Sequence, residues 1–211
     1  AEEIEDPRPY CEMIRQWSTF HPEFSFLPRK FKIAVTAAPH DRDAVKVHDI
    51  GLILYKNDEG ETGFEVIVGG GLGRTPYVGH TIRKFLPKKY LLSYLEAILR
   101  VYNLEGRRDN MYKARIKILV NAGGIETFAE KVEAEWAQIK DDGIDLPREE
   151  MARIDAYFAP PAFEKLPETS AALEEKKAAD SDFARWLRLN TVAHKAPGYA
   201  IVNISLKPIG G

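Results

Sequence analysis

The chain has 211 residues, of which 45% are hydrophobic, and its formal net charge at pH 7 is -2. This length and hydrophobic share suffice for one large domain, or for one domain with part of a second. The near-neutral charge gives no reason to expect nucleic-acid binding. No apolar run approaches the roughly 18 residues that a membrane helix needs, so we expect no membrane partner.

The chain contains a single cysteine, Cys11. A single cysteine excludes a disulfide within the chain and favours a reducing, cytoplasmic compartment. One cysteine cannot supply the four thiolates of a Cys₄ iron–sulfur site. The five histidines show no metal-binding spacing. We therefore predict no metal site made by this chain alone.

Residues 1–27 form a lead-in to the first predicted strand. Two interpretations of residues 8–20 remain open. They form either a short helix with Cys11, Ile14 and Trp17 on one face, or an irregular arm packed by its aromatic side chains.

Three segments alternate apolar and polar side chains, which predicts strands: residues 29–36, 48–56 and 62–68. Turn-forming residues occupy positions 57–60 between the second and third segments. The sequence therefore predicts a β-hairpin there.

Residues 85–140 show apolar side chains at helical spacing and predict three helices. Pro87 suits the first position of the first helix. Asp109 or Asn110 is the expected cap of the second helix, and Thr127 is the expected cap of the third.

The remaining residues differ in character. Proline residues and a charged run in residues 141–182 predict an exposed connector. Residues 183–190 predict a short turn or helix, and residues 198–206 predict a strand. Together, the predicted elements indicate an α+β fold, a mainly antiparallel sheet with helices packed against it, with its main domain at residues 28–140.

The first candidate site is a lysine pair. On a strand, Lys30 and Lys32 share one face while Phe31 points to the other. Two ammonium groups ~7 Å apart repel unless an anion or an acid lies between them, which favours an anion site. The alternative is a solvated edge strand, where lysine commonly discourages pairing with other chains.

The second candidate is the glycine run Gly69, Gly70 and Gly71, with Arg74 close behind. Glycines after a strand let backbone amides approach a bound group, and an arginine adds a bidentate contact to a carboxylate. No Walker motif is present, because no Gly-Lys-Ser/Thr follows. The alternative is a plain loop after the hairpin.

The third candidate is the basic segment that contains Arg107, Arg108, Lys113, Arg115 and Lys117. Cations near the start of a helix oppose its dipole. This placement indicates partners for them, such as acidic groups of a ligand. The alternative is a solvated helix face.

These segments together resemble the siroheme-dependent sulfite and nitrite reductases over about residues 24–140. The order and spacing of five motifs carry the resemblance: Leu27-Pro28-Arg29-Lys30-Phe31-Lys32, His48-Asp49-Ile50-Gly51, Gly63 to Leu72, Arg107 to Arg115, and Gly124-Ile125-Glu126-Thr127-Phe128. Residues 183–211 also look like the start of the family's second ferredoxin-like half. We therefore expect the chain to be a middle piece of a longer enzyme that includes the remaining halves.

The resemblance implies six-electron reduction of sulfite to sulfide or of nitrite to ammonia, at a siroheme beside a [4Fe-4S] cluster. A ferredoxin or a flavoprotein would supply the electrons. Lys30 and Lys32 match two lysines that contact the substrate and help to deliver protons. Five further residues would lie around the siroheme periphery: Gly69, Gly70, Gly71, Arg74 and Arg108.

The chain departs from the family pattern in two respects, of which the first is that the upstream arginines of the first ferredoxin-like half are absent. The second is that the two cysteine pairs that hold the family's cluster, Cys-x₅-Cys and Cys-x₃-Cys, are absent. We therefore expect the isolated chain to bind neither cofactor tightly and to be inactive alone. The alternative is a non-catalytic domain that binds an anion or a partner protein.

Overall fold

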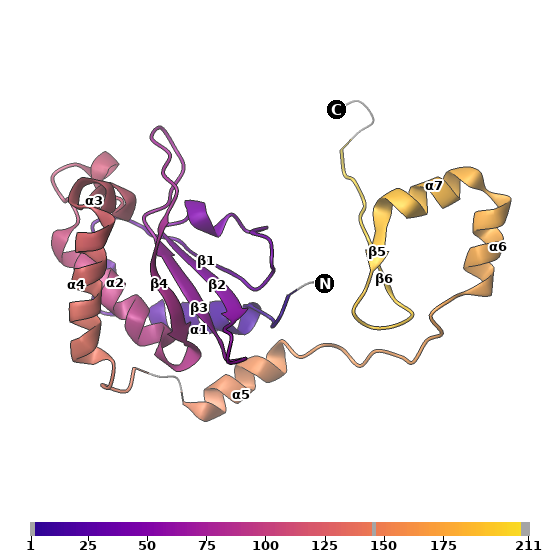
Figure 1. Ribbon diagram of the computed structural model, residues 1–211, viewed down its shortest axis with the longest axis horizontal. Helices are drawn as coiled ribbons and strands as arrows, with labels where there is room; N and C mark the ends of the chain where they lie inside the picture. The colour runs from indigo at the N-terminus through magenta and orange to yellow at the C-terminus, as the bar shows by residue number, and fades with distance from the viewer. Residues whose placement is uncertain (1–2, 145–146, 208–211) are drawn as a thin grey trace. The chain divides into compact units, whose positions relative to one another are not determined.

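The computed structural model describes residues 3–144 and 147–207 (Figure 1). They form two compact units, one that ends at Phe158 and one that begins at Ala159. Within the described ranges, no helix is both long and apolar enough to cross a membrane.

The larger unit is built on a four-stranded sheet in the order β1-β2-β3-β4. Strand β1 (Ile33–Thr36) runs parallel to β2 (Ile50–Lys56). Strands β2, β3 (Thr62–Val68) and β4 (His80–Pro87) are successively antiparallel. The predicted hairpin is therefore confirmed, and Gly60 in its turn has the positive φ of 82° that glycine permits.

The alternation of side chains along the hairpin builds the core. One face of β2 and β3 is buried, and its six apolar side chains are at most 2% exposed. The other face carries partly exposed residues such as Tyr55 and Glu65. The buried side chains are Ile50, Leu52, Leu54, Phe64, Val66 and Val68.

Residues 85–140 contain three helices after the sheet, as the sequence predicts: α2 (Leu91–Glu105), α3 (Ile116–Gly123) and α4 (Ile125–Ile139) (Figure 1). Helix α2 contributes more buried residues to the core than any other helix or strand, because almost every residue of its first three turns is buried. On α4, the residues at helical spacing face inward, and Trp136 stacks edge-on against Tyr94 at 5.3 Å.

The starts of these helices differ from the predicted ones. Pro87 ends β4, and the 3₁₀ turn η3 (Lys88–Tyr90) separates it from α2. Asn110 caps a second 3₁₀ turn, η4 (Met111–Lys113), where its side chain accepts a hydrogen bond from the amide of Tyr112. Helix α4 begins directly after Gly124, whose φ of 85° separates it from α3.

The N-terminal segment forms helix α1 (Arg8–Ser18), so the helical interpretation is correct. Ile14 is buried and Trp17 packs against the core, as predicted, but Cys11 is exposed. Tyr10 and Met13 are buried instead, and the Tyr10 ring meets Phe64 of the sheet edge-on at 5.1 Å.

Two strand predictions need correction. The first strand begins at Ile33 rather than at residue 29, so Lys30 and Lys32 precede it. Strand β4 was not predicted, because polar residues interrupt its alternation and its pairing with β3 shifts register twice.

Residues 141–182 contain two helices that the sequence did not predict. Helix α5 (Arg148–Tyr157) belongs to the larger unit and buries Ile154. Helix α6 (Ala171–Ala179) is followed by α7 (Ser181–Asn190) in the smaller unit.

The smaller unit ends in a short hairpin of β5 (Thr191–Ala193) and β6 (Ala200–Val202). The strand predicted at residues 198–206 is therefore shorter than expected, and β5 is its partner. The predicted end ranges 1–27 and 183–211 include residues 1–2 and 208–211, which lie outside the described residues.

Candidate functional site

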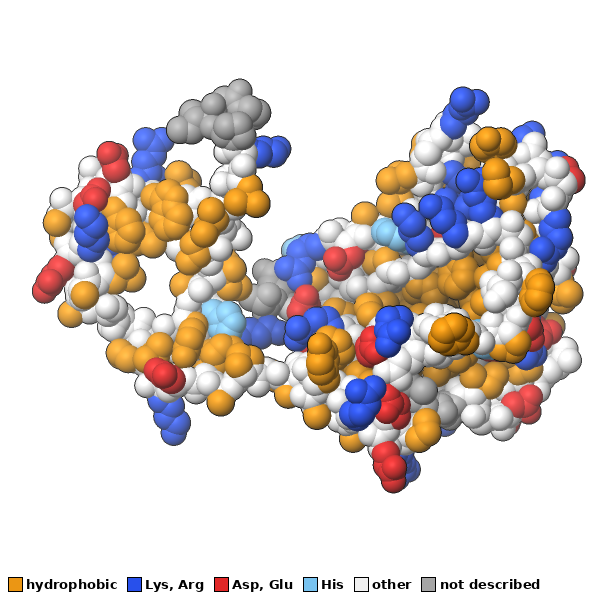
Figure 2. Space-filling model, turned by 180° about the vertical axis from the view of Figure 1, so that it is seen from behind, with side chains coloured by type: hydrophobic (Ala, Val, Ile, Leu, Met, Phe, Trp, Pro, Cys, Tyr) orange, Lys and Arg blue, Asp and Glu red, His pale blue; other side chains and the backbone are white. Residues whose placement is uncertain are grey.

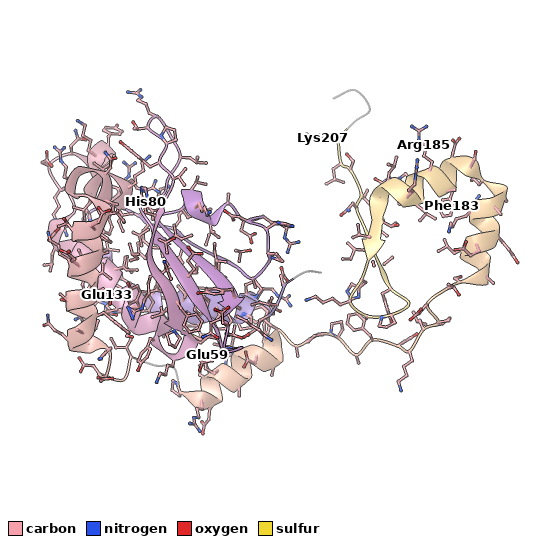
Figure 3. The ribbon with its side chains drawn as sticks, in the orientation of Figure 1. Glu59, His80, Glu133, Phe183, Arg185 and Lys207 are labelled. Carbon is pink, nitrogen blue, oxygen red and sulfur yellow. The ribbon has the colours of Figure 1, made fainter. Side chains whose placement is uncertain are left out.

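The sheet register brings the motif-bearing segments to one end of the sheet. Ile33, Ile50, Val68 and His80 lie side by side across the four strands. The lysine segment precedes Ile33, and the glycine run follows Val68. We call this the His80 end; Figure 3 labels His80 there and Glu59 at the opposite end, in the hairpin turn.

Asp49 joins three of these segments. It is 0% exposed, and one carboxylate oxygen accepts a hydrogen bond of 2.8 Å from the Lys32 amide. The Arg115 guanidinium donates two parallel bonds to the same carboxylate, at 2.9 Å and 2.7 Å. The Asp49 carbonyl accepts a bond of 3.0 Å from the Gly69 amide.

The two lysines of the first candidate are exposed, and Phe31 between them packs against the core. No ion pair in the described part of the chain involves Lys30 or Lys32. Lys30 borders an open hollow of about 370 Å³ that Phe24 and Leu27 also line. Both ammonium groups are therefore available to an anion from solvent.

The glycine run is held by contacts with the protein itself. A Cβ at Gly70 would lie 2.6 Å from the His48 carbonyl oxygen, and one at Gly71 would lie 2.7 Å from the Lys117 side chain. The Gly71 amide bonds to the Tyr77 carbonyl at 2.9 Å, and the reverse bond closes the loop. Close packing accounts for these glycines, and Arg74 is left exposed on the loop that they begin.

Lys117 is hydrogen-bonded to the loop that follows the glycine run. Its ammonium donates to the carbonyls of Leu72 at 3.0 Å and Thr75 at 2.5 Å, and the residue is only 7% exposed. Burial, reinforced by the nearby Arg115 cation, lowers the pKa of Lys117. Lys117 therefore stabilises the loop and is not presented to solvent.

Arg108 also has partners within the protein. It donates to the carbonyl of Phe26, in the 3₁₀ turn η1 (Phe24–Phe26), and to the carbonyl and side chain of Asn103, all at 2.7–2.8 Å. Arg107 pairs with Asp109. Four cations of the third candidate, Arg107, Arg108, Arg115 and Lys117, thus have partners within the protein. The fifth, Lys113, is exposed.

The exposed cations at the His80 end include Lys30, Lys32 and Arg74. Figure 2 shows Lys and Arg side chains gathered at this end of the larger unit. Such an arrangement can attract a small oxyanion or the carboxylates of a larger ligand.

Asp49 and Lys117 are the residues whose roles the sequence did not reveal. Asp49 precedes a strand and its partner Arg115 lies 66 residues away, so no local pattern links them. The sequence did contain one signal for this pair. Asp49 directly precedes a buried strand, and Arg115 is a cation at the start of a helix, so each needs a partner of opposite charge.

No group of three or more metal-binding side chains occurs in the described ranges. Cys11 is on α1, and the chain has no second cysteine. The donor set of this chain therefore does not fit a Cys₄ cluster.

Comparison with known proteins identifies a family and several relatives of this chain. A family model described as "Nitrite and sulphite reductase 4Fe-4S domain" matches residues 1–140. The chain is 40% identical over 116 residues to "Sulfite reductase (ferredoxin)" of Synechococcus elongatus, which covers 52% of this chain and 19% of that protein. It is 38% identical over 114 residues to "Sulfite reductase (NADPH) hemoprotein beta-component" of Staphylococcus haemolyticus, covering 51% and 20%.

The fold is shared with a solved structure. The Mycobacterium tuberculosis NirA protein superposes with a TM-score of 0.57 at 28% sequence identity, over 65% of this chain and 25% of that one. The predicted α+β class is thereby confirmed. The chain spans about a fifth of the length of the two curated relatives.

Proposed function

Because the chain belongs to the nitrite and sulphite reductase 4Fe-4S domain family, we propose that it forms the anion-handling part of an oxidoreductase. The intact enzyme would reduce sulfite to sulfide or nitrite to ammonia by six electrons. The observation that carries this proposal concerns Lys30 and Lys32, which are exposed and have no ion pair among the described residues. They lie at the same end of the sheet as the glycine loop, the His80 end.

The lysines would act on the substrate in two ways. Sulfite and nitrite are small anions, and two ammonium groups attract them more strongly where water is partly excluded. As oxygen leaves the substrate, a nearby ammonium stabilises the developing negative charge and donates a proton, which it regains from solvent.

The cofactors of the intact enzyme would be siroheme and a [4Fe-4S] cluster. When bound, siroheme would pass electrons to the anion. Arg74 is exposed and would pair with the siroheme carboxylates, whereas Gly69, Gly70 and Gly71 would border the siroheme through their backbone. The cluster thiolates must come from outside these 211 residues, because Cys11 is the one cysteine present.

Further proposals concern the rest of the enzyme. A ferredoxin or a flavoprotein would donate the electrons, because similar proteins carry ferredoxin or NADPH in their names. The site-bearing domain would be residues 28–140. Residues 183–211 would begin a second ferredoxin-like half, with residues 141–182 as the connector.

The test is to replace Lys30 or Lys32 by methionine in the whole reductase that contains this segment. Methionine keeps the side-chain length but removes the charge and the proton. We expect turnover to fall about ten- to a thousand-fold, with siroheme content unchanged. Turnover is measured with a non-physiological electron donor, so that donor docking does not contribute.

Lys56→Met is the matched control, because Lys56 is an exposed lysine at the opposite end of the sheet. It should leave turnover normal. Normal turnover in fully loaded Lys30→Met and Lys32→Met enzymes would refute the proposed role of the pair.

A further inference from the structure

The buried residue Asp49 is hydrogen-bonded to segments of the candidate site. Both of its oxygens accept hydrogen bonds, from the Lys32 amide and from the two nitrogens of Arg115. The Arg115 side chain is itself only 19% exposed. A buried carboxylate with this donor set is held in one orientation, because any rotation would break a charge-assisted bond.

The backbone around Asp49 extends the same connection. The Ile50 amide donates to the Lys32 carbonyl at 3.1 Å, so Lys32 is bonded on both sides of its Cα. The Gly69 amide donates to the Asp49 carbonyl at 3.0 Å. The lysine segment and the glycine loop are thus joined through one residue.

This connection matters because β1 begins only at Ile33. Lys32 lies just before the strand, where its carbonyl is bonded to β2 through the Ile50 amide. Its amide is bonded to the Asp49 side chain, which adds a second restraint on its direction.

We propose that Asp49 is a positioning residue for Lys32, which fixes the Lys32 backbone against the glycine loop so that its ammonium meets the bound anion. This inference rests on the proposed function. Asp49 does not touch the anion; it acts through Lys32.

The test uses the whole siroheme-loaded reductase and sulfite as the ligand. Asp49→Asn keeps the shape but weakens the bidentate pairing with Arg115. We expect the sulfite dissociation constant, measured by spectral titration, to rise about ten- to a hundred-fold, as for a displaced binding group. Hydrogen exchange at the Lys32 amide should accelerate in the same variant.

A double-mutant cycle separates positioning from general damage. In a Lys32→Met background, Asp49→Asn should weaken sulfite binding no further. An equal weakening in both backgrounds would overturn the inference. Unchanged or tighter binding in Asp49→Asn would also overturn it, and tighter binding is what the mere loss of a nearby negative charge predicts.

Two further variants complete the design. If Asp49→Asn does not fold, Arg115→Lys keeps the charge but loses the two parallel bonds, and the same cycle with Lys32→Met applies. Asp58→Asn, an exposed aspartate in the hairpin turn, is the control and should bind sulfite normally. Normal affinity and turnover in Lys32→Met itself would refute the proposed role of Lys32, and the Asp49 inference with it.

Discussion

At the scale of single residues, Tyr102 connects two segments of the candidate site without a charge. Its side chain is 0% exposed, and its hydroxyl lies 2.9 Å from the Ala114 carbonyl and 3.2 Å from the Arg29 carbonyl. Burial, together with the negative charge of Asp49, raises the pKa of Tyr102 to about 12. The neutral phenol therefore holds the lysine segment against the approach to α3.

We expect Tyr102→Phe to lower the free energy of unfolding by about 1–2 kcal/mol, because a buried donor is lost and two carbonyls remain. Urea unfolding measures this difference. The pKa is raised in the folded state, so the stabilisation is complete below about pH 10 and is lost as pH rises to about 12. A difference between the two proteins that stayed constant from pH 8 to pH 12 would contradict this.

At the scale of elements, the spacing of apolar and turn-forming residues predicted the hairpin β2–β3 and the helices α2 and α4. The hairpin β2–β3 was predictable, because strict alternation and turn residues coincide. Helices α2 and α4 were predictable from their apolar spacing. Strand β4 was not, because an edge strand that is half exposed has little reason to alternate.

The candidate site was predictable only in part, for a related reason. Sequence spacing singled out Lys30, Lys32 and the glycine run, and the register places them at one end of the sheet. The contacts that organise this end join residues far apart in the chain, such as Asp49 with Arg115. Tertiary packing decides such pairs, and no periodicity records them.

The glycine loop gives a prediction at this scale. A Cβ at Gly70 would meet the carbonyls of Lys46 and His48, which are backbone atoms and cannot move aside cheaply. We expect Gly70→Ala to destabilise the larger unit by about 1–3 kcal/mol, as overpacking does. Gly123→Ala is the control, because a Cβ there meets nothing within 4 Å and the residue is helical.

The control should be neutral or slightly stabilising, since alanine favours helix over glycine by about 1 kcal/mol. Both variants are compared by urea unfolding of the 211-residue chain. Equal effects of the two substitutions would show that Gly70 is not required by packing, and a ligand would then be the better explanation for the loop.

At the scale of the whole molecule, the two units differ in how they are stabilised. The core cluster consists of residues of the larger unit, with partly buried Met151 of α5 at its edge. In the smaller unit, none of residues 159–207 is buried, and Trp186 of α7 is 41% exposed. Without buried apolar surface, the hairpin β5–β6 has little free energy to resist opening.

We therefore expect a chain that ends at Phe158 to unfold at the same urea concentration as the 211-residue chain. In the longer chain, hydrogen exchange at the β6 amides should be much faster than at Val66, which is buried in the central hairpin. Protease should cut first between residues 159 and 170, where no helix or strand is present. A lower unfolding midpoint for the shortened chain would contradict this prediction. It would show that residues after Phe158 stabilise the larger unit although none of residues 159–207 is buried.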